Sequence, residues 1–511
     1  MKKISVKNTV SGLIFITVLS QILAFVRESI FAYYYGTSLA SDAYVMANQI
    51  PVTLFAIISS ALNTVILPIY SEKKVQKGER EAKIFLNSAM VCFGFVCTIA
   101  VIASEVFTVS IVKIFAPHFS GEVLVTTVRY TRMLFPTIFF TMVINVITVC
   151  YNTENRFSYP AIAALSQSLC AILAMIMLAS HIGALAAVLG AVIGIFVNMF
   201  LLVVPHVEVF KMPIGISSMW EDLKKVFSRV VPVTIGVGIA EINRIIDRAI
   251  ASGLDTGSIT ALNYANKLSV IFSALILSAV TTVAFKRFSE LYVLKKVKQR
   301  SRLLAEYMSL LLIILVPVTV GAIVLRNELI IVAFGRGAFD MSSISQTSKI
   351  FFYSGLGIAF IAVRELMAKY FYSGGDTRTP MMNAAIGVLV NIVLNFVLSK
   401  YMGASGLALA TTIANITVCI LLCSAIIMDQ TDFPFIMWMK NCISIIVGTT
   451  VMWIVIWFTN SLLEINYAIV KILLDFIIGA LSYLIVMMII APKLLKCTVG
   501  MLFENTKIKN E

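Results

Sequence analysis

Residues 19–51 read LSQILAFVRESIFAYYYGTSLASDAYVMANQIP, and this stretch decides the fold class. Two apolar runs meet in it: the first carries Arg27 and Glu28, and Asp42 opens the second. Runs of this length and apolar content are typical of helices that cross a bilayer. A charge near the middle of a bilayer costs at least ~2.5–3.5 kcal/mol, so such charges mark cavities or ion pairs by default. The stretch therefore predicts two membrane helices whose charged groups are turned away from lipid.

The composition of the whole chain points to the same class. Its 511 residues are 59% apolar and only 13% charged, whereas ordinary soluble domains carry about 25% charged residues. Too few charges remain to cover a water-facing surface, which excludes a soluble enzyme, a disordered chain and a nucleic-acid-binding domain. Only helices satisfy the backbone in lipid without closing a barrel, and the apolar runs lack the alternation of barrel strands. We predict an all-α, polytopic membrane protein.

Fourteen stretches are long and apolar enough to cross a membrane. They are residues 8–35, 42–70, 83–112, 124–150, 158–180, 183–206, 229–252, 258–288, 301–325, 343–372, 380–400, 404–428, 441–461 and 466–490. Basic residues gather in alternate loops, at 2–7, 73–83, 211–229, 286–302 and 493–509. Because basic residues collect in cytoplasmic loops, membrane topology accounts for the net charge of +14. Both termini are predicted to be cytoplasmic.

The sequence also contains an internal repeat. Residues 60–72, SALNTVILPIYSE, and residues 278–290, SAVTTVAFKRFSE, share six of thirteen positions at an offset of 218. A second pair relates YNTENRFSYP at 151–160 to YSGGDTRTP at 372–380, with one gap. The offset spans six predicted helices, an even number, so the two copies are parallel, which is a transporter plan. Chance similarity between apolar helices is the alternative interpretation.

The repeat predicts three parts of the chain. Residues 1–213 would form an N-terminal lobe of six helices. Residues 214–430 would form a second six-helix lobe, opening with a short surface helix, or a solvated loop, at 214–228. Residues 431–511 would add two further helices and a cytoplasmic tail. Two parallel lobes of this kind can rock against each other around a central cavity.

Ionisable residues recur inside the predicted spans or at their ends. The main group is Arg27, Glu28, Asp42, Glu241, Arg244, Asp247, Arg248, Lys267, Arg364, Glu365 and Lys369. Most of them fall in helices that the repeat relates, which predicts a hydrated cavity with an excess of basic groups. A guanidinium binds phosphate through paired donors. We therefore expect Arg27, Arg244, Arg248 and Lys267 to contact an anionic cargo, for which a diphosphate offers many acceptors.

Internal ion pairs are the alternative role for these charges. The pairs would be Arg27 with Asp42, Arg244 with Asp247, and Glu365 with Lys369. For the predicted span 343–372, ion pairs that act as a gate or a structural link are the favoured interpretation. Glu105, Lys471 and Asp475 are expected to be structural or interfacial, because long stems can reach the membrane surface.

A second set of polar residues has the chemistry of a cation site. Asn391 and Asn395 are spaced i,i+4, Thr411 lies on the next predicted helix, and Asp247 adds a carboxylate. Their oxygens are ligands that a hard cation prefers, although hydrogen bonding between membrane helices is the more common role of such asparagines. The sequence holds no catalytic set and no GxxxxGK[ST] phosphate loop. FGRGAF at 334–339 predicts an external hairpin.

Three blocks carry a resemblance to a known family. They are residues 19–51 quoted above, NRFSYPA at 155–161, and the stretch 247–268 with DRAIASGL and NYANKL. With these blocks the chain resembles the MurJ/MviN lipid II flippases of the multidrug/oligosaccharidyl-lipid/polysaccharide exporter superfamily. The resemblance covers nearly the whole chain and is strongest in the first two predicted spans.

The resemblance implies a transporter of the bacterial inner membrane. Such a protein moves the undecaprenyl-diphosphate-linked peptidoglycan precursor, lipid II, from the inner to the outer leaflet by alternating access. It implies no cofactor, and coupling to membrane potential or to a Na+ or H+ gradient. It also implies a lipid-linked saccharide as partner, with cell-wall synthesis proteins as further candidates, and a monomeric state.

The resemblance also suggests roles for individual residues. Arg27, Glu28 and Asp42 match functional residues of the family, and Lys267 stands where the family usually has a cavity arginine. We expect Glu28 and Asp42 to belong to the cargo site, where they would orient Arg27 and help to set the closed state. The cation site of the family would fall on Asp247, Asn391, Asn395 and Thr411.

The chain departs from the family pattern at several positions. Gln21 replaces a family arginine, Asn395 stands where the family can use an aspartate, and residues 50–62 lack the usual arginines and acid. A flippase for another polyprenyl-linked glycan, such as a teichoic acid or capsule unit, therefore stays open. A multidrug or cation antiporter is disfavoured by the arginines. A membrane enzyme is disfavoured because no external loop is long enough for a catalytic domain.

Overall fold

The computed structural model describes residues 6–429, 432–462 and 467–504, and within these ranges every regular element is a helix. This confirms the all-α prediction. Lys2, Lys3, Lys507 and Lys509, which contribute to the predicted charge bias of the loops, lie outside the described residues.

Packing divides the chain into two units. Unit 1 comprises Met1–Thr260 and Arg336–Ser343, and unit 2 comprises Ala261–Gly335 and Ile344–Glu511. The predicted boundaries at 213 and 430 come from the sequence repeat rather than from packing, and they stay a prediction.

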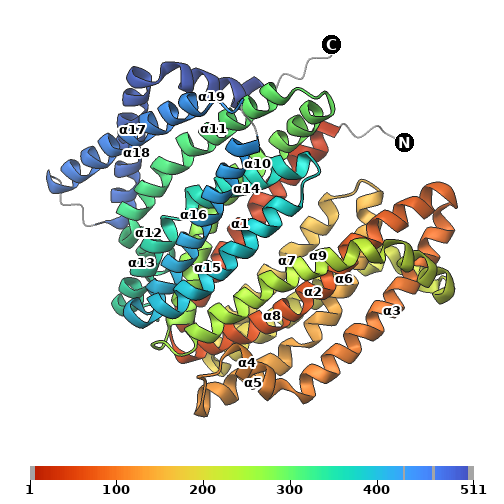
Figure 1. The fold of residues 1–511 in the computed structure, drawn as a ribbon. Coiled ribbons are helices and arrows are strands. Elements are labelled where there is room, and N and C mark those ends of the chain that lie inside the picture. The colour runs from red at the N-terminus through yellow and green to blue at the C-terminus, as the bar shows by residue number, and fades with distance from the viewer. Residues whose placement is uncertain (1–5, 430–431, 463–466, 505–511) are drawn as a thin grey trace. The chain divides into compact units, whose positions relative to one another are not determined.

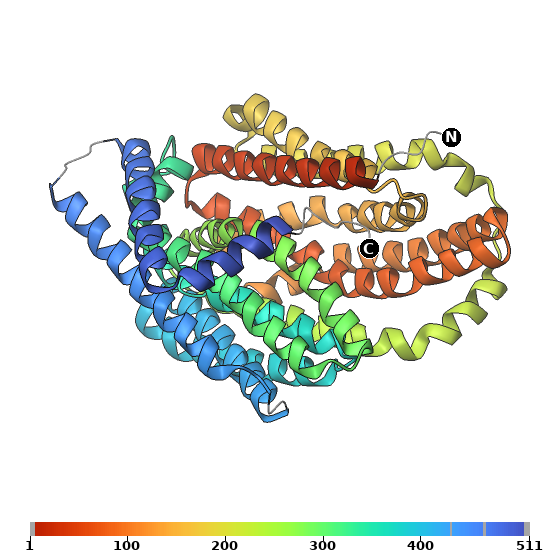
Figure 2. The ribbon, with the colours of Figure 1, turned by 90° about the horizontal axis from the view of Figure 1, so that it is seen from above.

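The described residues of unit 1 form ten helical elements. They are α1 (Val6–Tyr35), α2 (Leu39–Gln76), α3 (Glu79–Val106), α4 (Thr108–Phe115), α5 (Gly121–Leu134), α6 (Pro136–Thr153), α7 (Ser158–Ile182), α8 (Leu185–Val203), the 3-10 helix η1 (Val204–Lys211) and α9 (Ile216–Ala251). α2 packs against α3, α5, α6 and α9, so it is the central helix of the unit. α7 packs against both α8 and α1 (Figures 1 and 2).

Local sequence sets where α2 begins. Ser38 is an N-cap with an extended backbone, and Ser41 completes a capping box. The Ser38 hydroxyl accepts from the Ser41 N–H at 3.3 Å, and the Ser41 hydroxyl accepts from the Ser38 N–H at 2.7 Å. Two otherwise unpaired backbone donors are satisfied in this way. Pro51 and Pro68 lie inside the same helix, where membrane helices tolerate proline.

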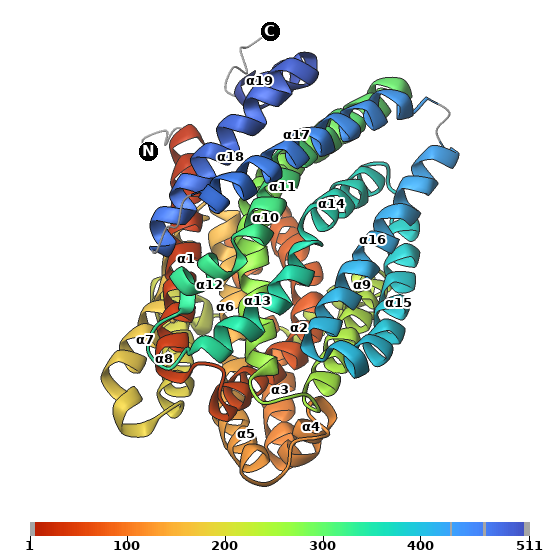
Figure 3. The ribbon, with the colours of Figure 1, turned by 90° about the vertical axis from the view of Figure 1, so that its left-hand side faces the viewer.

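Ten helices are likewise described in unit 2. They are α10 (Ser258–Val293), α11 (Val297–Val324), α12 (Arg326–Phe334), α13 (Met341–Gly355), α14 (Ile358–Ser373), α15 (Arg378–Met402), α16 (Ala404–Asp429), α17 (Phe435–Leu462), α18 (Ala468–Ile490) and α19 (Pro492–Glu504). The first three residues of α10 belong to unit 1. α17 and α18 pack against each other and on α11 (Figure 3). The Tyr483 hydroxyl fixes this packing by donating to the Ile313 carbonyl at 3.0 Å.

The described helices support a polytopic membrane protein. Twelve of them, some continued across a short break, are long and apolar enough to cross a membrane, and the bent helix α10 makes thirteen. The remaining predicted span, 229–252, coincides with the second part of α9 and its C-cap residue, and it carries five charged residues. The total of fourteen spans stays a prediction.

The prediction of a separate surface helix at 214–228 is wrong. Residues from Ile216 onward form the first part of the continuous helix α9. Asp222 in this part pairs with Lys73 at the end of α2, with 2.7 Å between carboxylate and ammonium. The buried Lys73 side chain therefore joins α2 to this part of α9.

Two glycines allow α8 to approach α7 closely. A Cβ at Gly190 would lie 2.7 Å from the Cα of Ala171, and one at Gly194 would lie 2.8 Å from the Cα of Gln167. Small residues at helix contacts are a usual source of stability in membranes, because the backbones can then meet.

We expect Gly194→Val to lower the stability of the protein by about 1–3 kcal/mol, since the helices must separate to admit the side chain. Thermal unfolding in detergent measures this. Gly238→Val is the matched control, because a Cβ there meets nothing within 4 Å. Equal unfolding temperatures for the two variants would contradict the assignment.

Candidate functional site

Arg27 and Glu28 form a local ion pair on α1. Arg27 Nη2 donates to Glu28 Oε1 at 2.8 Å. The Arg27 side chain keeps 29% of its surface exposed, whereas Glu28 is largely buried. Arg27 lies eight residues before the end of α1 at Tyr35, about 12 Å along the helix. One side of the guanidinium is thus fixed by its neighbour, and part of it stays open.

Asp42 caps the N-terminus of α10. Its carboxylate accepts the Gly257 N–H at 2.6 Å, the Thr260 N–H at 2.8 Å and the Thr260 hydroxyl at 2.6 Å. A buried carboxylate at this position satisfies unpaired backbone donors and complements the positive end of the helix. The expected contact between Asp42 and Arg27 is wrong: among the described residues Arg27 pairs with Glu28.

The α1–α2 turn receives two other backbone segments at very short range. A Cβ at Gly257 would lie 2.4 Å from the carbonyl oxygen of Thr37, and one at Gly337 would lie 2.3 Å from that of Tyr33. Both glycines have positive φ, a conformation that other residues rarely adopt. Glycine is therefore required at both positions for the segments to meet the turn.

The segment Arg336–Ser343, hereafter the strap, packs as part of unit 1, although the helices on either side of it belong to unit 2. The Ala338 N–H donates to the Tyr33 carbonyl at 2.8 Å, and the hydroxyls of Thr37 and Ser343 lie 2.7 Å apart. Hydrogen bonds from Ser343 lower the pKa of Asp340 below its ordinary value. The hairpin predicted at FGRGAF is thus a loop docked on the α1–α2 turn.

α9 carries the second group of charges in unit 1. Arg244 Nη1 donates to Glu241 Oε1 at 2.7 Å, and 57% of the Arg244 side chain is exposed while Glu241 is buried. Arg244 thus pairs with the acid one turn before it, whereas the ion-pair alternative named Asp247 as its partner. Arg248 lies within electrostatic range of Asp247 and Asp42.

The charges of unit 2 are paired differently from the predicted pattern. On α14, Arg364 donates to Glu365 at 2.6 Å and to the Asn415 side-chain oxygen at 2.7 Å. The predicted pair of Glu365 with Lys369 is wrong, since Lys369 Nζ lies 5.8 Å from the centre of the Phe285 ring. Arg364 reaches Glu365 because the two residues are adjacent on α14. Lys369 instead makes a cation–π contact with the ring of Phe285 on α10. Lys267 is half-buried on α10.

Three of the four candidate cation ligands form a hydrogen-bonded chain in unit 2. Asn395 Nδ2 donates to Asn391 Oδ1 at 3.0 Å, and Asn391 Nδ2 lies 3.3 Å from Thr411 Oγ1. The fourth, Asp247, lies on α9 in unit 1. Asn391 Oδ1 and Thr411 Oγ1 each accept an amide proton, so a cation at these two oxygens would have to displace a hydrogen bond. The arrangement fits helix–helix hydrogen bonding better than a preformed cation cage.

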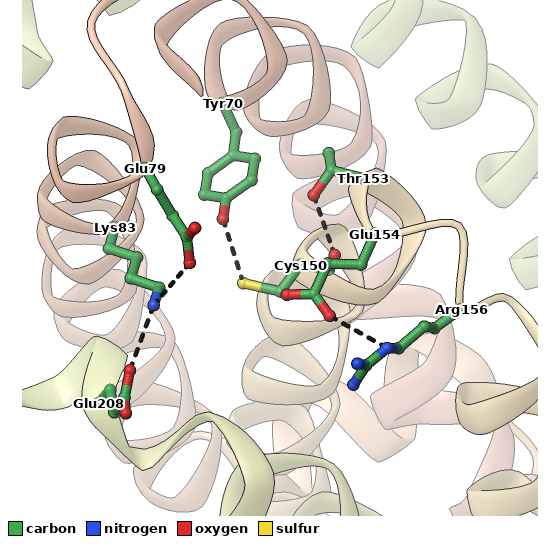
Figure 4. Close-up of polar contacts among 8 residues, drawn as sticks. All are labelled: Tyr70, Glu79, Lys83, Cys150, Thr153, Glu154, Arg156 and Glu208. Carbon is green, nitrogen blue, oxygen red and sulfur yellow. Dashed lines mark hydrogen bonds and ion pairs between the residues drawn. The ribbon is translucent and has the colours of Figure 1, made fainter. Parts of the chain in front are cut away.

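A polar cluster at one end of unit 1 escaped the sequence analysis (Figure 4). Lys83 bridges Glu79 at 2.8 Å and Glu208 at 3.2 Å, which ties η1 to the start of α3. Beside it the Cys150 thiol lies 3.7 Å from the Tyr70 hydroxyl. The i,i+4 spacing of Glu79 and Lys83 was a usable signal, but the partner in η1 is 125 residues away. The cluster ties helices together and offers no catalytic geometry.

Known structures and sequences define the class and then the family. An inward-facing MATE family transporter of the MOP superfamily superposes with a TM-score of 0.65 at 12% identity, covering 84% of this chain and 95% of that one. The fold is therefore that of the MOP-superfamily membrane transporters. A structure titled lipid II flippase MurJ, inward closed conformation, gives a TM-score of 0.82 at 26% identity over 94% of this chain and 99% of that one. The family model described as lipid II flippase MurJ matches residues 31–478, and the chain belongs to this family.

Curated relatives agree with the family match. The lipid II flippase MurJ of Burkholderia cenocepacia is 28% identical over 414 residues, 79% of each chain. The probable lipid II flippase MurJ of Thermotoga maritima is 26% identical over 403 residues, 78% of this chain and 81% of that protein. The chain is accordingly a multi-pass membrane protein of a bacterial transporter family, which is not a family of enzymes.

The cap on α10 is open to a direct test. Asp42→Asn replaces one acceptor oxygen by an amino group that faces N–H donors, so we expect a stability loss of about 1–2 kcal/mol. Thr260→Val removes one of the three hydrogen bonds and should lose less. Thermal unfolding of the two variants measures the order, and an unchanged unfolding temperature for Asp42→Asn would count against the cap.

Proposed function

We propose that this chain is a flippase that moves lipid II from the inner to the outer leaflet of the bacterial cytoplasmic membrane. Membership of the lipid II flippase family supports the cargo, and the two relatives cited above carry the same activity in their names. Transport proceeds by alternating access, both termini are cytoplasmic, and the protein acts as a monomer beside the cell-wall synthesis proteins that use its product.

The single observation that carries the proposal is the state of the two arginines in unit 1. Arg27 and Arg244 are each held by a carboxylate within one turn on the same helix, and each keeps an open surface. A guanidinium that is open at membrane depth needs water or an anion, because lipid is far too costly a neighbour. Fixed guanidinium groups bind phosphate oxygens through paired donors. We assign Arg27, Arg244, Arg248 and Lys267 to the diphosphate of the cargo, with Glu28 as the residue that orients Arg27.

We assign the turn between α1 and α2 the role of a gate, that is, a set of contacts that closes one end of the transport path. The hydrogen bonds that join Asp42 to the start of α10, and the turn to the strap, are made by backbone groups and short polar side chains. We propose that these contacts close the external end of unit 1 and release when the transporter opens outward.

Coupling to membrane potential or to a Na+ or H+ gradient completes the proposal. Moving one charge through 100 mV is worth about 2.3 kcal/mol, enough to bias two conformations of similar stability. Asp247, Asn391, Asn395 and Thr411 are the proposed cation ligands. When the ion binds, the hydrogen bonds of the Asn391 and Asn395 amides would break and the freed oxygens would coordinate the ion.

A second cargo class is favoured by two substitutions. Lys267 is a point charge where the family usually has a bidentate arginine, and Gln21 replaces another arginine. A polyprenyl-linked glycan with a different head group is therefore the alternative cargo for the same site.

Cross-linking tests the gate. We expect Thr37→Cys combined with Ser343→Cys to form a disulfide on oxidation, since the two hydroxyl oxygens lie 2.7 Å apart. The oxidised protein should lose transport and regain it on reduction, whereas either single variant should be unaffected by oxidant. Full transport by the cross-linked protein would refute the gate assignment.

Complementation tests the cargo site. In bacteria depleted of their own lipid II flippase, the parent chain should restore growth, and Arg27→Ala should fail because a phosphate partner is lost. Arg302→Ala is the matched control, since Arg302 pairs with Glu306 on an exposed helix face. Failure of a well-expressed parent would favour the alternative cargo, and rescue by Arg27→Ala would remove Arg27 from the site.

A further inference from the structure

Asp475 is a buried acid on α18 with only half of its carboxylate satisfied. Its side chain is 1% exposed. Oδ2 accepts from Asn460 Nδ2 on α17 at 3.0 Å. Oδ1 is buried and has no hydrogen-bond partner among the described residues. An ionised carboxylate normally accepts several hydrogen bonds, so this environment is poor for a negative charge.

Among the described residues, the cation near Asp475 already has another acid as its partner. Lys471 lies one turn before Asp475, and its Nζ donates to Glu328 Oε1 on α12 at 2.5 Å. Glu328, Lys471 and Asp475 are two acids and one base, so the fully ionised group carries a net charge of −1. Leaving such a charge uncompensated inside a membrane protein has a substantial free-energy cost, so we expect it to be neutralised.

The helices packed on α18 supply no second counter-ion among the described residues. On α12, Arg326 donates to the Ile323 carbonyl at 3.0 Å and lies over the Phe352 ring. On α17, Lys440 is 20 residues from Asn460, about 30 Å along the helix. The charged side chains that are described on α11 and α19 lie at that same far end; they are Lys298, Arg300, Arg302, Glu306, Lys493 and Lys496.

We propose that Asp475 is a proton-binding site that holds one proton at neutral pH and leaves the group of Glu328, Lys471 and Asp475 uncharged. We place the proton on Asp475 because Glu328 already has the ammonium group of Lys471 as its ion-pair partner. Burial favours the neutral form of the acid, and this form still accepts the hydrogen bond from the Asn460 amide. Loss of the proton leaves an uncompensated negative charge between α12, α17 and α18, which weakens the docking of the α17–α18 hairpin.

Infrared spectroscopy of the full chain in a maltoside detergent tests the proposal without any transport assay. The wild type should show the carbonyl stretch of a protonated carboxylic acid at neutral pH, and Asp475→Asn should lack it. The band should vanish only at alkaline pH. Glu306→Gln is the control: it alters an acid that pairs with Arg302 at 3.0 Å and should leave the band unchanged.

A second variant keeps Asp475 in place and moves its counter-ion. Glu328→Gln frees Lys471, which is i,i+4 to Asp475 and can pair with it, so the protonated-acid band should disappear. Coincident spectra of wild type and Asp475→Asn at neutral pH would overturn the proposal.

Carbodiimide labelling separates a proton from a metal cation. The reagent modifies protonated buried acids, so Asp475 should be labelled at neutral pH equally in Na+ and in K+ solutions. Protection by Na+, together with an ionised acid in the infrared spectrum, would mean that a cation occupies the site, and the proton proposal would be wrong. None of these outcomes bears on which cargo the chain carries.

Discussion

The cost of leaving a charge unpaired in the membrane governs the described structure. Asp42 meets this constraint by accepting three hydrogen bonds at the start of α10. Arg27 and Arg244 meet it through acids within one turn on the same helix. Lys471 meets it by pairing with Glu328 from another helix. Some of these partners lie on the same helix as the charge and others lie on a different segment, and the proposed functions follow from that difference.

Pairs within one helix move with the helix. The contacts of Arg27 with Glu28 and of Arg244 with Glu241 lie within one helix each, so a rigid movement of that helix leaves them intact. Contacts between segments behave differently. The cap of Asp42 on α10 and the strap on the α1–α2 turn break when their segments separate, which makes them suited to a gate and unsuited to permanent cargo binding.

The sequence alone predicted the helical class, the limits of most spans and the residues that bring charge into the membrane, because apolar length and charge are local properties. It could not predict partners. Asp42 pairs with residues 215 and 218 positions later, and no local pattern encodes that contact. For Glu365 the i,i+4 rule allowed Lys369, but the adjacent Arg364 reached the acid while the Phe285 ring took the lysine. The docking of the strap likewise depends on tertiary contacts some 300 residues apart.

Binding of defined lipids to the purified protein tests the central claim, that fixed guanidinium groups of unit 1 recognise a diphosphate. Native mass spectrometry can compare undecaprenyl diphosphate with undecaprenyl monophosphate and undecaprenol, for the parent chain and for Arg244→Ala. The account predicts a preference for the diphosphate of about tenfold or more, because paired donors engage the added phosphate, and a loss of that preference in the variant. Equal affinity of the parent for all three lipids would contradict it.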